Sequence, residues 1–119
     1  MSDEIRILKQ WVEESDNIVF FGGAGVSTES GIPDFRSVDG LYNQRYEYPP
    51  ETILSHSFFC SKPAAFFFFF REKMTFDPKE IRPNAAHWAL ARLEAEGKME
   101  GSGIVTQNID GLHSEAGSR

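Results

Sequence analysis

Polar side chains of the kinds used in catalysis gather near the end of the sequence, in the stretch TQNIDGLHSEAGSR. Four polar residues come directly after the apolar pair Ile104-Val105: Thr106, Gln107, Asn108 and Asp110. Amides and carboxylates at the carboxyl end of a parallel strand lie where α/β folds bind ligands. In the alternative interpretation, Asn108 or Asp110 only caps the next helix. His113 follows closely, and its type raises the question of whether it is a general base.

A second candidate is the glycine-rich stretch IVFFGGAGVSTESG. Small residues after a strand let the backbone approach a pyrophosphate, and N–H groups at the start of the next helix can bind its charge. The dinucleotide fingerprint G-x-G-x-x-G is incomplete, because Thr28 stands where its last glycine belongs. No second strand with an acidic end follows at the usual distance of about 20 residues. Two interpretations of this stretch therefore remain, a tight turn and a dinucleotide-binding loop. The missing features disfavour an ordinary dehydrogenase.

A third candidate is SGIPDFR, in which Pro33 stiffens a loop and Asp34 and Arg36 flank Phe35. In a plain loop, Asp34 and Arg36 would form a surface ion pair and Phe35 would be a packing anchor. In a ligand site, the same three side chains offer an apolar wall and charged groups that orient a ribose or a carboxamide.

The elements that position these motifs follow an α/β pattern. Residues 2–15 are predicted to form a helix capped by Ser2, and residues 17–21 a buried strand that ends at the glycines. A second helix is expected from Pro83 to a stop at Gly97. Its apolar stripe is Ala86, Leu90 and Leu93. A short strand at Ile104-Val105 follows, so helix and strand alternate as in an α/β layer.

The middle of the chain, residues 37–82, contains no convincing strand. Ser61 and Pro63 favour a helix over residues 62–75. Its five consecutive phenylalanines sweep more than one turn at about 100° each, so they cannot all face one core. We expect an overpacked core helix; the alternative is an exposed face that receives an apolar ligand.

The composition restricts the class of protein. The 119 residues suffice for one domain, and a hydrophobic share of 40% with 25% charged residues is ordinary for a globular chain. A net charge of −6 disfavours nucleic acid and anionic membranes as direct partners. The single cysteine, Cys60, excludes a disulfide framework or a multi-cysteine metal site within these residues. Without a signal-peptide or membrane-span pattern, we expect a cytoplasmic protein.

Together the motifs closely resemble the sirtuins, the NAD-dependent protein deacylases. The resemblance rests on GAGVSTESGIPDFR and TQNIDGLH, supported by PNAAH at residues 83–87 and by Ser37-Val38-Asp39-Gly40-Leu41. It covers the whole chain and matches the N-terminal part of a sirtuin. It implies a Rossmann-like parallel sheet, here partial, formed by residues 1–36 and 83–119. Residues 37–82 would be the cofactor-binding loop and an inserted helical module, and the zinc module would be absent from this chain.

The resemblance also implies roles for individual residues. The glycine loop would contact NAD, Phe35 and Arg36 would lie beside the nicotinamide-side ribose, and Gln107 would hold ribose hydroxyls. Asn108 and Asp110 would be the catalytic residues, Asn108 by positioning atoms near the ribose and Asp110 by orienting the carboxamide. The implied NAD-binding set is Gly23, Ala24, Gly25, Thr28, Asp34, Phe35, Arg36, Gln107, Asn108, Ile109 and Asp110.

The implied reaction transfers an acyl group from lysine to ADP-ribose with release of nicotinamide. Its general base is a histidine in a His-Gly element that would follow Arg119, so it is not in this chain, and the zinc cysteines would come later still. His113 is therefore expected to be structural, and His87 to make a structural hydrogen bond. The chain alone is expected to be inactive as a deacylase. Its partners would be acyl-lysine proteins or peptides.

Two further expectations concern substrate and alternatives. Sirtuins that prefer acidic acyl groups carry a tyrosine and an arginine where this sequence has Phe67 and Phe70. Because phenylalanine cannot bind a carboxylate, we expect an uncharged acyl group. The alternatives are a non-catalytic module that binds NAD or ADP-ribose and, less favoured, a nicotinamide-dependent dehydrogenase.

Overall fold

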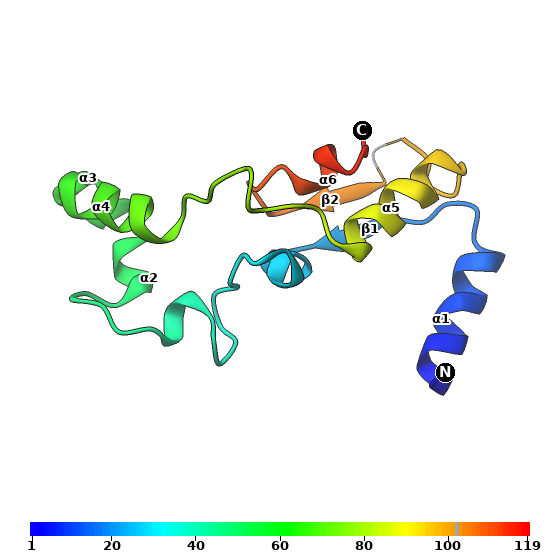
Figure 1. The fold of residues 1–119 in the computed structure, drawn as a ribbon, viewed down its shortest axis with the longest axis horizontal. Helices are drawn as coiled ribbons and strands as arrows, with labels where there is room; N and C mark the ends of the chain where they lie inside the picture. Colours follow the sequence, from blue (N-terminus) through cyan, green and yellow to red (C-terminus); the bar gives the residue numbers. More distant parts are fainter. Residues whose placement is uncertain (102) are drawn as a thin grey trace. The chain divides into compact units, whose positions relative to one another are not determined.

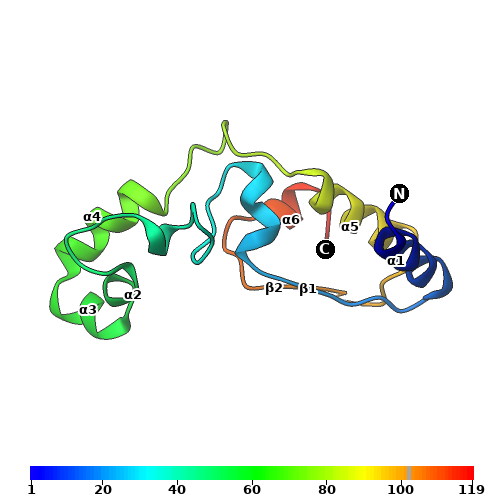
Figure 2. The ribbon, with the colours of Figure 1, turned by 90° about the horizontal axis from the view of Figure 1, so that it is seen from below.

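The computed structural model describes residues 1–101 and 103–119. These residues form two compact units, the first made of Met1–Val26 with Pro83–Arg119 and the second of Ser27–Arg82. Figures 1 and 2 show the elements of each unit. The assignment of residues 1–36 and 83–119 to a Rossmann-like NAD-binding domain stays a prediction. Among the described residues, no helix has both the length and the apolar character needed to cross a membrane.

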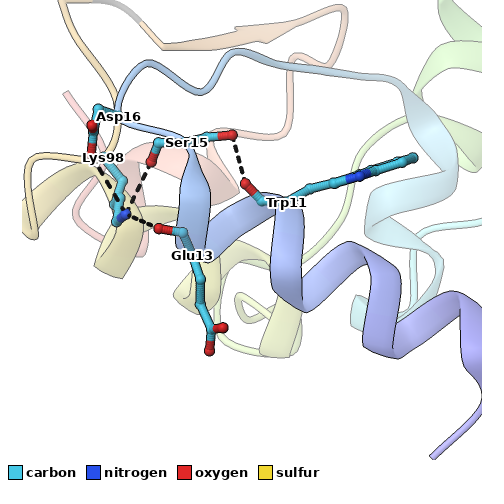
Figure 3. Close-up of polar contacts among 5 residues, drawn as sticks. All are labelled: Trp11, Glu13, Ser15, Asp16 and Lys98. Carbon is cyan, nitrogen blue, oxygen red and sulfur yellow. Dashed lines mark hydrogen bonds and ion pairs between the residues drawn. The ribbon is translucent and has the colours of Figure 1, made fainter.

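The first unit opens with helix α1, Asp3–Glu14. As predicted, the hydroxyl of Ser2 caps it and accepts a hydrogen bond from the backbone N–H of Ile5 at 3.4 Å. None of its residues is buried, and the apolar face that includes Trp11 is exposed. At its other end, the ammonium of Lys98 donates to the carbonyl oxygens of Glu13 and Ser15 (Figure 3). Polar contacts thus link the helix end to the rest of the unit.

A parallel pair of strands forms the centre of this unit (Figures 1 and 2). Strand β1 is Phe20–Gly22 and strand β2 is Ile104–Thr106, with Phe20 opposite Ile104 and Phe21 opposite Val105. The α/β class is confirmed, but the prediction of a buried strand over residues 17–21 is wrong. Phe21 is 67% exposed and Val105 46%, because the sheet has two described strands and this face is uncovered.

Helix α5, Ala85–Ala95, precedes β2, and helix α6, Leu112–Glu115, follows it. The predicted stop of α5 is confirmed, since Gly97 has a φ of +76°, a backbone conformation that suits glycine. The predicted stripe is only partly confirmed, because Leu90 is buried and Ala86 is exposed. The buried residues of this unit include Leu90, Met99, Leu112, Ala116, His87 and His113.

The second unit is helical. After the 3₁₀ helix η1, Ala24–Ser30, which crosses from the first unit, come η2 (Leu41–Asn43), α2 (Pro50–Ile53), α3 (His56–Ser61) and α4 (Pro63–Lys73). The absence of strands from its described residues agrees with the prediction, as does α4 with Pro63 at its start. Helices α2 and α3 were not predicted. Ile53, Phe58 and Phe69 form the core.

The phenylalanine run of α4 is not a core helix buried on several sides, so that prediction is wrong. Phe69 is only 5% exposed, whereas Phe68 is 67% and Phe67 46% exposed. Steps of about 100° send successive rings to different sides. The short helices of this unit cover the side that carries Phe69, and the rings of Phe66, Phe67 and Phe59 contact one another edge to face instead.

Candidate functional site

The glycine turn after β1 is shaped by close packing on one side and open space on the other. A Cβ on Gly22 would overlap the ring of Phe20, so this position admits no side chain without a shift of that ring. A Cβ on Gly23 would lie 3.4 Å from the Oε1 of Gln107. A Cβ built on Gly25 would meet no heavy atom within 4 Å, so the side of Gly25 on which a side chain would stand is open to a ligand.

The turn is bonded directly to the TQNID stretch, although the two are far apart in sequence. The backbone N–H of Gln107 donates to the carbonyl of Gly22 at 3.1 Å and continues the strand pairing. The side-chain amide of Asn108 then donates to the carbonyl of Gly23 at 2.9 Å. Asn108 therefore holds the glycine loop and does not cap the next helix.

Asp110 precedes Gly111, the N-cap of α6, and its Oδ1 accepts a hydrogen bond at 3.0 Å from the N–H of Leu112, the first residue of that helix. Gly111 supplies the sharp turn between them with a φ of +74°. Ile109, immediately before, is 82% exposed. An exposed apolar side chain between Asn108 and Asp110 offers a surface for a flat ring, with polar groups on both sides.

His113 lies in helix α6 and is buried, with 6% of its surface exposed. Neither ring nitrogen has a hydrogen-bond partner within the part of the chain that the structure describes. Its ring contacts the His87 ring edge to face, with 4.8 Å between the ring centroids, and the Phe20 ring, with 5.9 Å between the centroids. A buried imidazole packed between two rings cannot reach a substrate proton, so the expectation of a structural role for His113 agrees with its position.

His87 is fully buried and accepts a hydrogen bond at Nδ1 from the backbone N–H of Asn84 at 3.1 Å, as predicted. Burial lowers the pKa of His87 below its ordinary value, since desolvation disfavours the charged imidazole. His113 lowers this pKa further, and Asp110 opposes the shift. The lowered pKa favours the neutral form of the His87 imidazole, whose ring contacts that of His113.

The SGIPDFR loop belongs to the second unit, and its side chains make contacts with residues that follow closely in sequence. Asp34 accepts hydrogen bonds at Oδ1 from the N–H and the hydroxyl of Ser37, and its carbonyl accepts from the N–H of Leu41 at 2.7 Å. The half-buried Phe35 ring contacts the Tyr42 ring at 5.4 Å, and the Arg36 guanidinium lies over that ring at 5.7 Å. Asp34 and Arg36 do not form the surface ion pair of the plain-loop interpretation.

This loop borders a pocket of about 450 Å³ lined by Thr28, Gly31, Pro33, Asp34, Ser37 and Asp39. Thr28 is exposed at one side of it. Of the proposed acyl-pocket residues in α4, Phe67 is 46% exposed, and Phe70 is half-buried and stacks on Phe66 at 6.1 Å.

The structure therefore brings together one part of the predicted set and places the rest in the other unit. Within the first unit lie Gly23, Ala24, Gly25, Gln107, Asn108, Ile109 and Asp110; within the second lie Thr28, Asp34, Phe35, Arg36, Phe67 and Phe70. In the described residues, no group of three or more His, Cys, Asp or Glu side chains could hold a metal ion. Asn84 was not predicted, although an asparagine before an apolar helix signals a cap.

Comparison with known proteins identifies the family. Residues 23–119 match the sequence profile of the Sir2 family. The NAD-dependent protein deacetylase of Clostridium acetobutylicum is 59% identical over 119 residues, which are 98% of this chain and 47% of that protein. That of Clostridium perfringens is 54% identical and is covered to 48% by the whole chain.

Solved structures of Sir2 enzymes are also similar to this chain. A chain solved for the structural basis of the mechanism and regulation of Sir2 enzymes superposes with a TM-score of 0.85 at 45% identity, over 100% of this chain and 44% of that one. A Sir2–p53 peptide–NAD+ complex superposes with a TM-score of 0.75 at 38% identity, over 100% of this chain and 43% of that one. The chain spans about half the length of the curated relatives that it matches. By sequence profile, identity and fold, this chain belongs to the Sir2 family.

Proposed function

We propose that this chain is part of an NAD-dependent protein lysine deacylase, a deacetylase, which transfers the acyl group of an acyl-lysine to ADP-ribose and releases nicotinamide. The observation that carries the proposal is the direct bonding of the glycine loop to the TQNID stretch through Asn108 in a Sir2-family chain. The relatives that are named NAD-dependent protein deacetylases support the activity. Since the chain spans about half of their length, the reaction is proposed for the full-length enzyme that carries this sequence.

NAD, as the co-substrate, would supply the ADP-ribosyl group that accepts the acyl group. The residues present fit such a ligand: the space that a Cβ on Gly25 would enter is open, and the apolar side chain of Ile109 stands exposed beside Asp110. In this proposal Ile109 contacts the nicotinamide ring, Asp110 orients its carboxamide, and Gln107 holds ribose hydroxyls. Gly23, Ala24, Thr28, Asp34, Phe35 and Arg36 would complete the NAD site.

The remaining assignments complete the proposal. Residues 1–36 and 83–119 are the NAD-binding domain, and residues 37–82 the cofactor-binding loop and helical module. The general base is a histidine outside these 119 residues, because His113 is buried and His87 is engaged by Asn84. A zinc module also lies outside them. Cytoplasmic acyl-lysine proteins are the substrates.

We further propose that the acyl group is uncharged, because Phe67 and Phe70 provide no cation for a carboxylate. The full-length enzyme should prefer acetyl-lysine or a longer aliphatic acyl-lysine peptide over a succinyl-lysine peptide. Competition between these peptides at equal concentration measures the preference, and faster turnover of the succinyl peptide would refute it.

The role of Asp110 is tested by two substitutions that separate its bond to Leu112 from ligand binding. Asp110→Asn keeps an Oδ1 that can accept from the N–H of Leu112, so α6 and the melting temperature should be retained, whereas Asp110→Ala loses this hydrogen bond as well. Both variants should lose most NAD-dependent deacetylation. Nicotinamide release from an acetyl-lysine peptide is the assay, and an unchanged rate in Asp110→Asn removes Asp110 from the site. A change at the reduced-nicotinamide absorbance band would indicate a dehydrogenase instead. Residues 1–119 alone should show no turnover.

A further inference from the structure

The side chain of Asn84 makes hydrogen bonds in two directions. Its Oδ1 accepts from the N–H of Ala86 at 2.9 Å and caps helix α5. Its Nδ2 donates to the carbonyl of Val26 at 2.8 Å, across 58 residues of sequence. Because one amide supplies both an acceptor and a donor, the start of α5 and the end of the glycine loop are joined through a single side chain.

Asn84 is itself fixed to the buried part of the unit. Its backbone N–H donates to Nδ1 of His87, which completes a capping box, and His87 is fully buried. About one turn of α5 after His87, Leu90 is also buried and anchors the helix. The amide that reaches Val26 therefore projects from a rigid helix end, and its position is set by the core.

The other end of the same loop segment is held in the same way. Asn108 donates its amide to the carbonyl of Gly23 at 2.9 Å, and the N–H of Val26 donates back to the carbonyl of Gly23 at 3.2 Å. Two asparagine amides thus bind the main-chain carbonyls at both ends of Gly23–Val26. Glycine-rich backbone loses much conformational entropy when it is ordered, so fixing this segment before a ligand arrives favours binding.

We propose that Asn84 is a positioning residue for the glycine loop and that its amide sets the affinity of the enzyme for NAD. Asn84 touches neither substrate; it acts through Val26 on the loop. The inference rests on the proposed function, because it takes the ligand of the loop to be NAD. It predicts a specific effect on NAD, and no effect on the acyl-lysine peptide.

The test is a pair of substitutions that keep the cap and remove the donor. Aspartate and serine cap helices as well as asparagine does, but aspartate sets a carboxylate against the Val26 carbonyl, and serine is too short to reach it. In the full-length enzyme, Asn84→Asp and Asn84→Ser should raise the KM for NAD about fivefold to tenfold, the loss of one hydrogen bond. The kcat and the KM for an acetyl-lysine peptide should stay within about twofold.

Amide hydrogen exchange provides a second measurement that does not depend on activity. Exchange of the Gly23–Val26 amides should accelerate about fivefold to tenfold in both variants, while exchange along α5 stays unchanged. Asn17→Asp is the matched control, since Asn17 is an exposed asparagine of the same unit and its replacement adds the same charge. It should change neither quantity.

The outcomes separate the inference from the proposed function. If the wild-type enzyme neither binds ADP-ribose nor deacetylates, the proposed function fails, and the exchange comparison still decides whether Asn84 positions the loop. Unchanged loop exchange and an unchanged KM for NAD in both variants would overturn the inference. A parallel loss of kcat with faster exchange along α5 would overturn it too, because the effect would then be general destabilisation.

Discussion

Replacing Lys98 with methionine should release the C-terminal end of helix α1 while leaving the rest of the unit folded. The ammonium of Lys98 donates to the carbonyl of Glu13 at 2.9 Å and to that of Ser15 at 3.0 Å, and it lies 3.8 Å from a carboxylate oxygen of Asp16 (Figure 3). These carbonyls stand at a helix end, where four main-chain acceptors have no partner within the helix. Methionine keeps the length and apolar character of the side chain and removes the charge.

The magnitude follows from these contacts. A hydrogen bond to a charged group contributes about 1.5–3 kcal/mol, and a cation at a helix C-terminus about 0.3–1 kcal/mol. Ordering a lysine side chain costs up to about 2 kcal/mol. The ion pair with Asp16 adds little, because that carboxylate is 97% exposed. With the Lys98 side chain 26% exposed, we expect a net loss of about 1–2 kcal/mol.

Because α1 buries no residue, this loss should appear as local opening of the helix and not as a lower global stability. Amide hydrogen exchange of residues in α1 should accelerate about fivefold to thirtyfold in Lys98→Met, with little change in α5. The matched control is Lys9→Met, which removes an exposed pair with Glu13 at 3.7 Å and should change exchange much less. Equal acceleration in the two variants would refute the reasoning.

Two further predictions concern the buried His87 and the glycine turn after β1. Because the pKa of His87 is lowered in the folded state, the unfolded chain takes up a proton first on acidification. Urea unfolding should show the full free energy of unfolding above about pH 6.5 and a loss below that pH of at most about 1.4 kcal/mol per pH unit. This loss should be smaller in His87→Gln than in the exposed control His56→Gln, and equal losses in the two variants would contradict the prediction. Gly22→Ala should lower the free energy of unfolding by about 1–3 kcal/mol because its Cβ meets Phe20, whereas Gly25→Ala, in open space, should change it much less; thermal melts of the two variants test the difference.

Local signals in the sequence were sufficient to predict the helices whose ends have a capping, starting or stopping residue. Ser2 before α1, Pro63 at the start of α4 and Gly97 after α5 all act within a few residues of sequence, and the structure places each as expected. Helices α2 and α3 were missed because they are one or two turns long. At that length an apolar period cannot develop.

Burial was predicted less well, since it depends on partners that a local pattern does not specify. The apolar run at residues 17–21 has the composition of a central strand, yet Phe21 and Val19 are 67% and 64% exposed. The five phenylalanines were expected to fill a core, but only Phe69 is buried. In both places the residue types fix how much apolar surface exists, and the tertiary arrangement decides how much of it is covered.

The bonds around the glycine loop explain why residues 84 and 108 are asparagines. Asn84 and Asn108 each bind a main-chain carbonyl of the glycine loop, which requires a donor, and Asn84 also needs an acceptor for its cap. Asp110 accepts from the N–H of Leu112, a bond that a carboxylate makes well. All three are equally good caps by local preference, so their types looked interchangeable in the sequence. Only the long-range partners distinguish these residues. Asn84 and Asn108 donate to carbonyl oxygens that lie 58 and 85 residues away in sequence, which requires an amide N–H. An aspartate at either position would place a carboxylate oxygen against a carbonyl oxygen, and the two would repel each other.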